Sequence, residues 1–171
     1  MRGSLKVGGF GNMISIKEET IIEAKPENIF NFLSRIDSLY KVWHPKDHIF
    51  CRTIDKDLNE RGCIFHFLEI IGGFPLYLIL TVSKLKKNEF IEYKPIFPLS
   101  IFNLGMGSFA IERISDKLSK LTARVEYGNH FALLDKIFQL FVKTEAIRKH
   151  IQEEGQNLKK YLESKPLQNE G

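Results

Sequence analysis

The chain of 171 residues is long enough for one domain with a substantial core, and its 43% apolar content excludes wholesale disorder. Its net charge of +4 comes from basic residues mixed with acids along the whole sequence, so no nucleic acid is expected as a partner. No apolar run resembles a signal peptide or reaches the roughly 20 residues of a membrane span, so stable membrane insertion is not expected.

The cysteine and phenylalanine contents bear on the compartment and on the ligand. Cys51 and Cys63 form neither a disulfide framework nor a CxxC metal knuckle, so a reducing cytoplasm is the expected location. The 14 Phe fill a wide core or line a pocket for an aromatic or lipid-like molecule, and the core is the commoner of these roles. The composition leaves the oligomeric state unknown.

The chain begins with a glycine-rich lead-in over residues 1–11, and a single domain is expected over residues 12–165. From Met13 to Ala24 apolar and polar residues alternate, which predicts a strand with one wet face. Pro26 then occupies a first helical position and opens a short amphipathic helix. A second short helix, over residues 36–43, ends before Pro45.

Strand-like runs separated by turn residues follow, and their spacing suits an antiparallel meander. They cover residues 48–54, 63–71, 74–84, 89–93, 104–114 and 118–127. The apolar loop over residues 94–102 predicts a lid in preference to a membrane-touching tip, because no basic cluster adjoins it. From Leu133 to Leu162 apolar residues recur at helical spacing, which predicts one long C-terminal helix before a polar tail over residues 166–171.

Two acids stand where apolar residues are expected. Glu154 falls within the apolar arc of the long helix, and His150, four residues earlier, projects from the same side. Alternation within residues 63–71 places Glu69 on one face with Phe65 and Phe67. Because burying an unpaired charge costs several kcal/mol, each acid needs a partner.

The segment from Trp43 to His48 adds two imidazoles, His44 and His48, where the second helix meets the second strand. Two histidines and two carboxylates from three elements predict a site for a divalent ion, and zinc suits this ligand set. A buried hydrogen-bonded network without metal satisfies the same burial rule. Asp47 is either an acceptor that orients a ligand imidazole or simply a residue at a strand start.

Over residues 13–163 the order of elements resembles the START-like, or helix-grip, superfamily. The stretch from Ile22 to Phe30, IEAKPENIF, is similar to the strand-to-helix entry of that superfamily. The resemblance implies an α+β fold in which a curved antiparallel sheet of about seven strands, two short helices and the long C-terminal helix enclose an apolar cavity. A small hydrophobic molecule is then the expected partner.

A closer resemblance lies in the stretch from Tyr40 to His48, YKVWHPKDH, which looks like the Y-x-x-W-H-P-x-D-H phrase of the diacetylphloroglucinol hydrolase family. Members of that family hold zinc with two His and two Glu, and they cleave the carbon–carbon bond between an acetyl group and a phenolic ring. Carried onto this chain, the resemblance implies zinc (Zn2+) ligands at His48, Glu69, His150 and Glu154, with His44 as the reserve ligand.

The same resemblance implies that Tyr40 orients the substrate or donates a proton, although a tyrosine that only packs fits a short helix equally well. The expected function is a zinc-dependent hydrolase of a small phenolic or diketone-like substrate. In it, water activated by the metal attacks an acyl carbonyl and a carbon–carbon bond breaks. Two alternatives are a non-catalytic carrier of a lipid or hydrophobic ligand, and a metal-free polyketide cyclase-like enzyme that uses the same side chains as general acids and bases.

Overall fold

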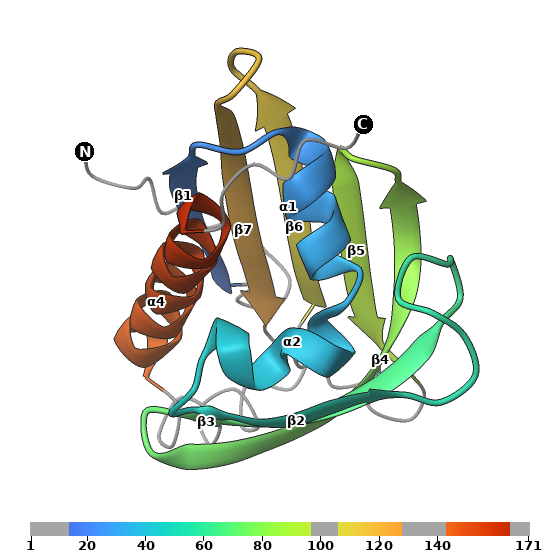
Figure 1. The fold of residues 1–171 in the computed structure, drawn as a ribbon. Helices are drawn as coiled ribbons and strands as arrows, with labels where there is room; N and C mark the ends of the chain where they lie inside the picture. The colour runs from blue at the N-terminus through green and yellow to red at the C-terminus, as the bar shows by residue number, and fades with distance from the viewer. Residues whose placement is uncertain (1–13, 97–105, 128–142, 165–171) are drawn as a thin grey trace.

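The computed structural model describes residues 14–96, 106–127 and 143–164 (Figure 1). Within these ranges seven strands and three helices follow one another in the order that the sequence predicts. In chain order they are β1 (Ile14–Ile22), α1 (Pro26–Leu33), α2 (Ile36–Trp43), β2 (His48–Thr53), β3 (Ile64–Ile71), β4 (Phe74–Lys86), β5 (Phe90–Pro95), β6 (Met106–Arg113), β7 (Ser119–Tyr127) and α4 (Thr144–Glu163).

The strands form one antiparallel sheet in the order β1-β7-β6-β5-β4-β3-β2. Strands adjacent in the sequence from β2 to β7 pair with each other, and β1 pairs with β7 along its whole length, from Ile14 opposite Tyr127 to Ile22 opposite Ser119. The sheet curves strongly, so that β2 and β3 pass beneath α2 while β7, β6 and β5 stand behind the helices (Figure 1). The predicted α+β helix-grip architecture is confirmed.

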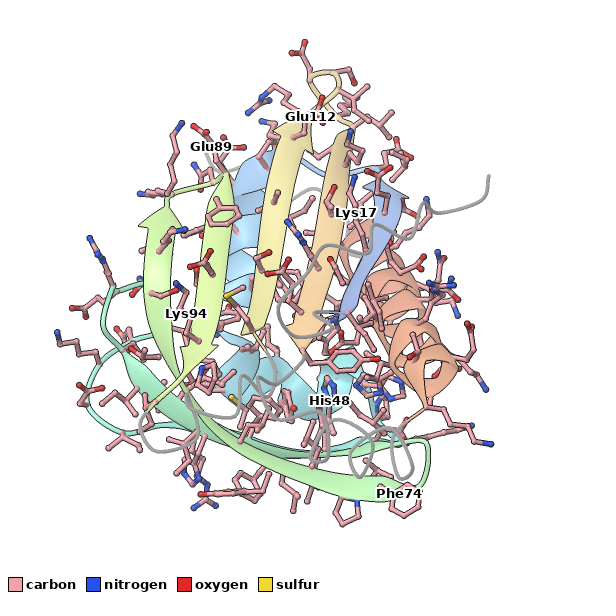
Figure 2. All side chains as sticks on the ribbon, turned by 180° about the vertical axis from the view of Figure 1, so that it is seen from behind. Lys17, His48, Phe74, Glu89, Lys94 and Glu112 are labelled. Carbon is pink, nitrogen blue, oxygen red and sulfur yellow. The ribbon has the colours of Figure 1, made fainter. Side chains whose placement is uncertain are left out.

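The sheet has a wet outer face and an apolar inner face, as alternation predicts. Seen from behind, the outer face carries charged side chains such as Lys17 and Lys94 (Figure 2). The inner face contributes fully buried residues, among them Ile16, Ile22 and Phe65, to two apolar clusters beneath the helices. Cys51 and Cys63 are buried free thiols. Within the described ranges no helix combines the length and hydropathy of a membrane span.

Local chemistry explains where several elements begin and end. Pro26 opens α1 after Lys25, which is extended and acts as the N-cap. The α2 helix ends at Trp43, because His44 precedes Pro45 and leaves the helical region of backbone space (φ −141°, ψ 85°). The β5 strand runs on to Pro95, inside the predicted loop, since it pairs there with the long strand β4.

The C-terminal helix is shorter than its apolar pattern predicted. Lys143 has an extended backbone (φ −71°, ψ 137°), and α4 begins only at Thr144. The prediction of a single continuous helix from Leu133 to Leu162 is therefore wrong. Residues 133–142 lie outside the described ranges. The spacing of apolar side chains reports which side of a segment is buried, but it does not report whether the backbone is continuous.

Two glycines let α4 approach the sheet closely. A Cβ atom on Gly155 would lie 2.2 Å from Thr20 Oγ1 on β1. At the β3–β4 turn, Gly72 and Gly73 both have positive φ (60° and 88°), as a two-residue hairpin turn requires. A Cβ atom on Gly72 would lie 2.9 Å from Cβ of Ala146 in the first turn of α4. The α4 helix therefore packs closely against β1 and against the β3–β4 turn.

Gly155→Ala should destabilise the protein, because the added methyl group has to displace Thr20 or the helix. Overpacking of this kind costs about 1–3 kcal/mol and lowers the melting temperature by several degrees, which calorimetry would measure. Adding Thr20→Ala should recover most of the loss, since it removes the hydroxyl that the methyl group meets. Gly107→Ala is the control, because its Cβ would lie 3.9 Å from Tyr93. Equal losses for the two glycine variants would contradict the expectation.

Candidate metal centre and cavity

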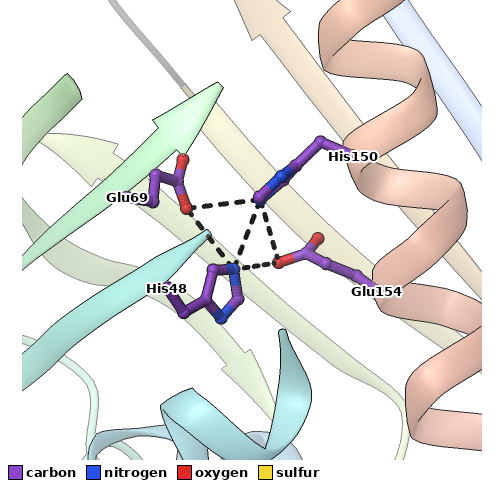
Figure 3. Close-up of side chains that lie close together, drawn as sticks. All are labelled: His48, Glu69, His150 and Glu154. Carbon is purple, nitrogen blue, oxygen red and sulfur yellow. Dashed lines mark hydrogen bonds and ion pairs between the residues drawn. The ribbon is translucent and has the colours of Figure 1, made fainter. Parts of the chain in front are cut away.

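Four titratable side chains from three elements converge on the inner side of the sheet (Figure 3). His48 is the first residue of β2, Glu69 lies opposite it on β3, and His150 and Glu154 occupy successive turns of α4. One donor atom from each side chain lies within 4.8 Å of the other three. All four side chains are largely buried, with exposed fractions of 0% to 12%.

A β-bulge turns the His48 side chain inward. The register between β2 and β3 shifts between His48 and Phe50, so Ile49 is an extra residue on β2. In a regular strand His48 and Cys51 would face opposite sides, because their spacing is odd. With the bulge, both are buried on the inner side, and His48 stands opposite Glu69. The bulge therefore gives the site its β2 member.

The α4 helix is held to α2 at the site itself. The indole N–H of Trp43 donates to the backbone carbonyl of Glu154 over 3.1 Å, and both groups are buried. This bond fixes the position, relative to α2, of the helical turn that carries Glu154. Residues four apart share a helix face, so His150 points to the same side as Glu154.

The geometry of the four donor atoms fits a tetrahedral ion. Ligand atoms about 2.0–2.1 Å from one zinc ion at tetrahedral corners lie about 3.3 Å from each other. Five of the six separations run from 3.1 to 3.9 Å. His48 Nε2 lies 3.1 Å from Glu154 Oε1, 3.3 Å from His150 Nε2 and 3.6 Å from Glu69 Oε2. His150 Nε2 lies 3.6 Å from Glu69 Oε2 and 3.9 Å from Glu154 Oε1. Two imidazole nitrogens and two carboxylate oxygens are a donor set that suits zinc.

The hydrogen bonding of His48 leaves its Nε2 atom free to bind such an ion. Its Nδ1 lies 2.9 Å from the backbone carbonyl oxygen of Tyr40, which can only accept, so Nδ1 carries the proton. In the neutral ring, Nε2 then presents its lone pair to the centre of the group. This is the usual arrangement of a metal-ligating histidine.

The His150 imidazole is surrounded by negative charge. Burial opposes protonation of the ring, but contact with Glu69 and the charges of Glu154, Glu69 and Asp47 outweigh it and raise the pKa of His150 to about 9. Its Nε2 faces the centre, and its Nδ1 lies 3.5 Å from Asp47 Oδ2. At neutral pH a proton on His150 thus balances part of the charge that a cation would balance.

His44 lies behind His150 and outside the four-residue group. Its ring stacks on that of His150, with ring centroids 4.6 Å apart and planes 14° apart. Its Nε2 lies 3.0 Å from Glu153 Oε2 and 3.7 Å from Asp47 Oδ2. The structure therefore brings His48 into the central group, while His44, Asp47 and His150 form a second, outer group.

Tyr40 joins the group to the cavity. Its hydroxyl donates to Glu69 Oε2 over 2.9 Å, and its ring stacks on His48 with centroids 3.8 Å apart. Burial, and then the charges of Glu69 and Glu154, raise the pKa of Tyr40 far above its ordinary value. The phenol is therefore a protonated hydrogen-bond donor at neutral pH.

The group opens onto an apolar cavity of about 130 Å³ between the sheet, α2 and α4. Tyr40, Glu69, His150 and Glu154 lie in its wall, and the rest of the described lining is mainly aliphatic and aromatic. The sequence placed Phe65, Phe67 and Glu69 on one face of β3, and all three line the cavity. A hydrophobic molecule in this space would meet the polar group at one part of the wall.

Other residues singled out in the sequence lie elsewhere. His66 faces the outer side of β3, where its Nδ1 lies 3.0 Å from the Tyr77 hydroxyl. Residues 97–102 of the predicted lid lie outside the described ranges. The sequence analysis predicted neither the bond from Trp43 to Glu154 nor the bulge at Ile49. The position of Trp43 beside His44 and His48 is the one sequence signal that points to the bond.

No family model matches the chain, and no curated protein matches its sequence. Solved structures do match. The major latex-like protein 151 of Panax ginseng gives a TM-score of 0.70 at 9% identity, over 90% of this chain and 99% of that one. Norcoclaurine synthase of Thalictrum flavum, in complex with dopamine and hydroxybenzaldehyde, gives 0.65 at 15% identity, over 97% and 99%. The KanY protein gives 0.69 at 12% identity, over 90% and 99%.

At these identities the likeness concerns the fold alone. None of the comparisons points to the diacetylphloroglucinol hydrolase family, so that closer resemblance stays a prediction. The neighbours share the fold that the order of elements indicated. The chain has the helix-grip fold.

Proposed function

We propose that this protein is a metal-dependent hydrolase of a small hydrophobic, phenolic or diketone-like substrate, with His48, Glu69, His150 and Glu154 as ligands of zinc or a similar divalent ion. The observation that carries the proposal is the buried tetrahedral arrangement of four donor atoms at the wall of an apolar cavity. A zinc ion held there would supply a Lewis acid that polarises a carbonyl and brings the pKa of water to about 7.

The residues of the chain supply binding, orientation and a proton. The apolar wall removes the substrate from bulk water, which strengthens every polar contact inside the cavity. Tyr40 keeps its proton and can donate a hydrogen bond to an oxygen of the substrate beside Glu69. Hydrolysis of an acyl carbon–carbon bond adds hydroxyl to the acyl carbon and a proton to the carbon that leaves. Tyr40 would relay that proton, which comes from the attacking water, so that the phenol gains one proton as it gives one up and stays neutral.

Elemental analysis tests the proposal directly. Protein purified without added metal should contain about one divalent ion per chain. It should also release acetate from a phenol with an acetyl group on a ring carbon, such as 2,4-dihydroxyacetophenone. Dialysis against a chelator should remove the ion and abolish this activity. Restoring zinc should restore both. Absence of the ion together with failure to take up added zinc would rule the metal model out.

Asp47→Asn should weaken zinc binding about tenfold, because an amide replaces the carboxylate that faces His150 Nδ1 across 3.5 Å. Groups that orient a ligand imidazole contribute about 10- to 100-fold to metal affinity. Competition with a chelating dye would measure the change. Asp116→Asn, on an exposed turn, makes the same chemical change away from the site and should leave the affinity unchanged. If both variants bind zinc with unchanged affinity, Asp47 does not orient the imidazole and is only a residue at the start of a strand.

The apolar cavity also supports a second function, that of a carrier. The norcoclaurine synthase of similar fold is described with dopamine and hydroxybenzaldehyde, which are small aromatic molecules. A carrier should retain an apolar ligand through mild extraction, visible by native mass spectrometry, and should turn nothing over. Full turnover after exhaustive chelation would instead favour a metal-free cyclase-like enzyme that uses the same histidines and acids.

A further inference from the structure

Tyr93 on β5 lies in the cavity wall away from the metal group. Starting at Tyr40, neighbouring rings in the wall make a chain of contacts. Tyr40 and Phe67 have ring centroids 6.1 Å apart, and Phe67 and Phe65 have centroids 6.3 Å apart. Phe65 then meets Tyr93 edge-on at 5.1 Å. Two phenylalanines thus separate Tyr93 from Tyr40 on this side.

A second series of ring contacts links Tyr93 to His48. Tyr93 and Phe109 have centroids 6.1 Å apart, and Phe109 and Trp43 have centroids 5.7 Å apart. Trp43 meets the ring of His48 at 5.4 Å, and His48 stacks on Tyr40. Two rings, those of Phe109 and Trp43, therefore separate Tyr93 from His48 on this path, and three separate them on the path through Tyr40. Tyr93 and the metal group both border the cavity.

The Tyr93 hydroxyl is a buried polar group to which no described residue is hydrogen-bonded. The residue is 4% exposed, and its hydroxyl has no hydrogen-bond partner among the described residues. Tyr40, in contrast, uses its hydroxyl on Glu69. Buried hydroxyls are nearly always hydrogen-bonded, so an unpaired one in a cavity wall points to an acceptor that arrives with a ligand.

The hydroxyl acts as a donor. Burial in the wall raises the pKa of Tyr93 well above its ordinary value, and the negative charge of Glu154 acts in the same direction. The phenol therefore keeps its proton at any physiological pH. Because a neutral phenol in apolar surroundings gains most from an oxygen acceptor, the complementary group is a carbonyl or a phenolic or ether oxygen.

We infer that Tyr93 is a second polar contact in the cavity and selects a ligand with an oxygen acceptor at the end remote from His48 and Glu69. As a statement about the substrate, this inference rests on the proposed function. The cavity of about 130 Å³ is close to the roughly 150 Å³ of an apolar cavity that admits benzene. The ligand is accordingly one six-membered ring with short substituents and an oxygen at each end.

Two probes of equal shape test this inference on metal-free protein. Acetophenone carries a carbonyl where α-methylstyrene carries a methylene group, and the fluorescence of Trp43, the sole tryptophan, reports binding because Trp43 lines the cavity. Tyr93→Phe should weaken acetophenone about 3- to 10-fold and α-methylstyrene less than about 2-fold. Tyr77→Phe, the same change on the outer face, should alter neither affinity.

Infrared spectroscopy of carbonyl-labelled acetophenone provides a second readout. In the wild type the carbonyl stretch should move to lower frequency than in a hydrocarbon solvent, and Tyr93→Phe should move it back. Equal losses for both probes, an unshifted stretch in the wild type, or failure of both probes to bind would each overturn the inference. Because no metal is present, none of these results depends on the metal model, and a protein without metal could still pass the test.

Discussion

Glu154→Gln should release the metal from the purified protein while leaving the fold intact. Glutamine keeps the shape of the side chain but replaces an anionic donor by a neutral one, at a position where Oε1 lies 3.1 Å from His48 Nε2. Structural zinc sites with four ligands bind with about 10–16 kcal/mol, so loss of one anionic ligand should weaken binding on the order of 100- to 1000-fold. Metal content after gel filtration, with circular dichroism as the check on folding, would measure the effect.

His150→Ala should behave like Glu154→Gln, since it removes a donor from the same helix face. Lys149→Ala is the matched control, because its side chain is 76% exposed and pairs only weakly with Glu153 at 3.7 Å. The control should retain its metal. If the three variants lose metal alike, the ion lies elsewhere; if all three keep it, these side chains do not hold it.

The affinity for zinc should rise with pH, by about tenfold per unit between about pH 7 and pH 8, and should level off above about pH 9. The reason is that a metal ion and a proton compete for His150 Nε2, and the pKa of His150 is raised from 6.5 to about 9 in the metal-free protein. Below this pKa, binding has to release the proton, so each unit of acidification costs a factor of about ten. Titrations with chelator-buffered zinc at several pH values would measure the slope.

Direct measurement of proton release provides the control for this prediction. At about pH 7, calorimetry in buffers of different ionisation enthalpy should show about one proton leaving per ion bound. Above about pH 9.5 that number should fall toward zero for this group. An affinity that stays constant from about pH 7 to pH 9 would contradict a protonated His150 in the metal-free site.

The sequence was sufficient to find those parts of the site that depend on simple periodicity. The spacing of His150 and Glu154 places both on one side of a helix, and alternation in β3 turns Glu69 inward with Phe67. These inferences rest on the repeats of regular elements, which hold over short distances. The element order predicted the fold for the same reason, because each strand and turn has its own local signal.

The rest of the site depends on irregularities that local patterns do not encode. The bulge at Ile49 decides that His48 faces inward, and a regular strand would have given a different inner set for β2. The outer position of His44 follows from the backbone turn before Pro45, and the break at Lys143 interrupts an otherwise continuous apolar pattern. The Tyr93 hydroxyl lacks a hydrogen-bond partner among the residues that the structure describes, and this emerges only when the contacts of its neighbours are known.

The bond between Trp43 and Glu154 joins residues 111 positions apart, and His48 and His150 are 102 positions apart. A partly folded chain in which α4 has not yet docked therefore has no complete site. An ion that binds there binds the native state alone and protects it by about 2.7 kcal/mol at a hundredfold excess over its dissociation constant. The resistance of this protein to heat and proteolysis would then rise with the concentration of the free ion.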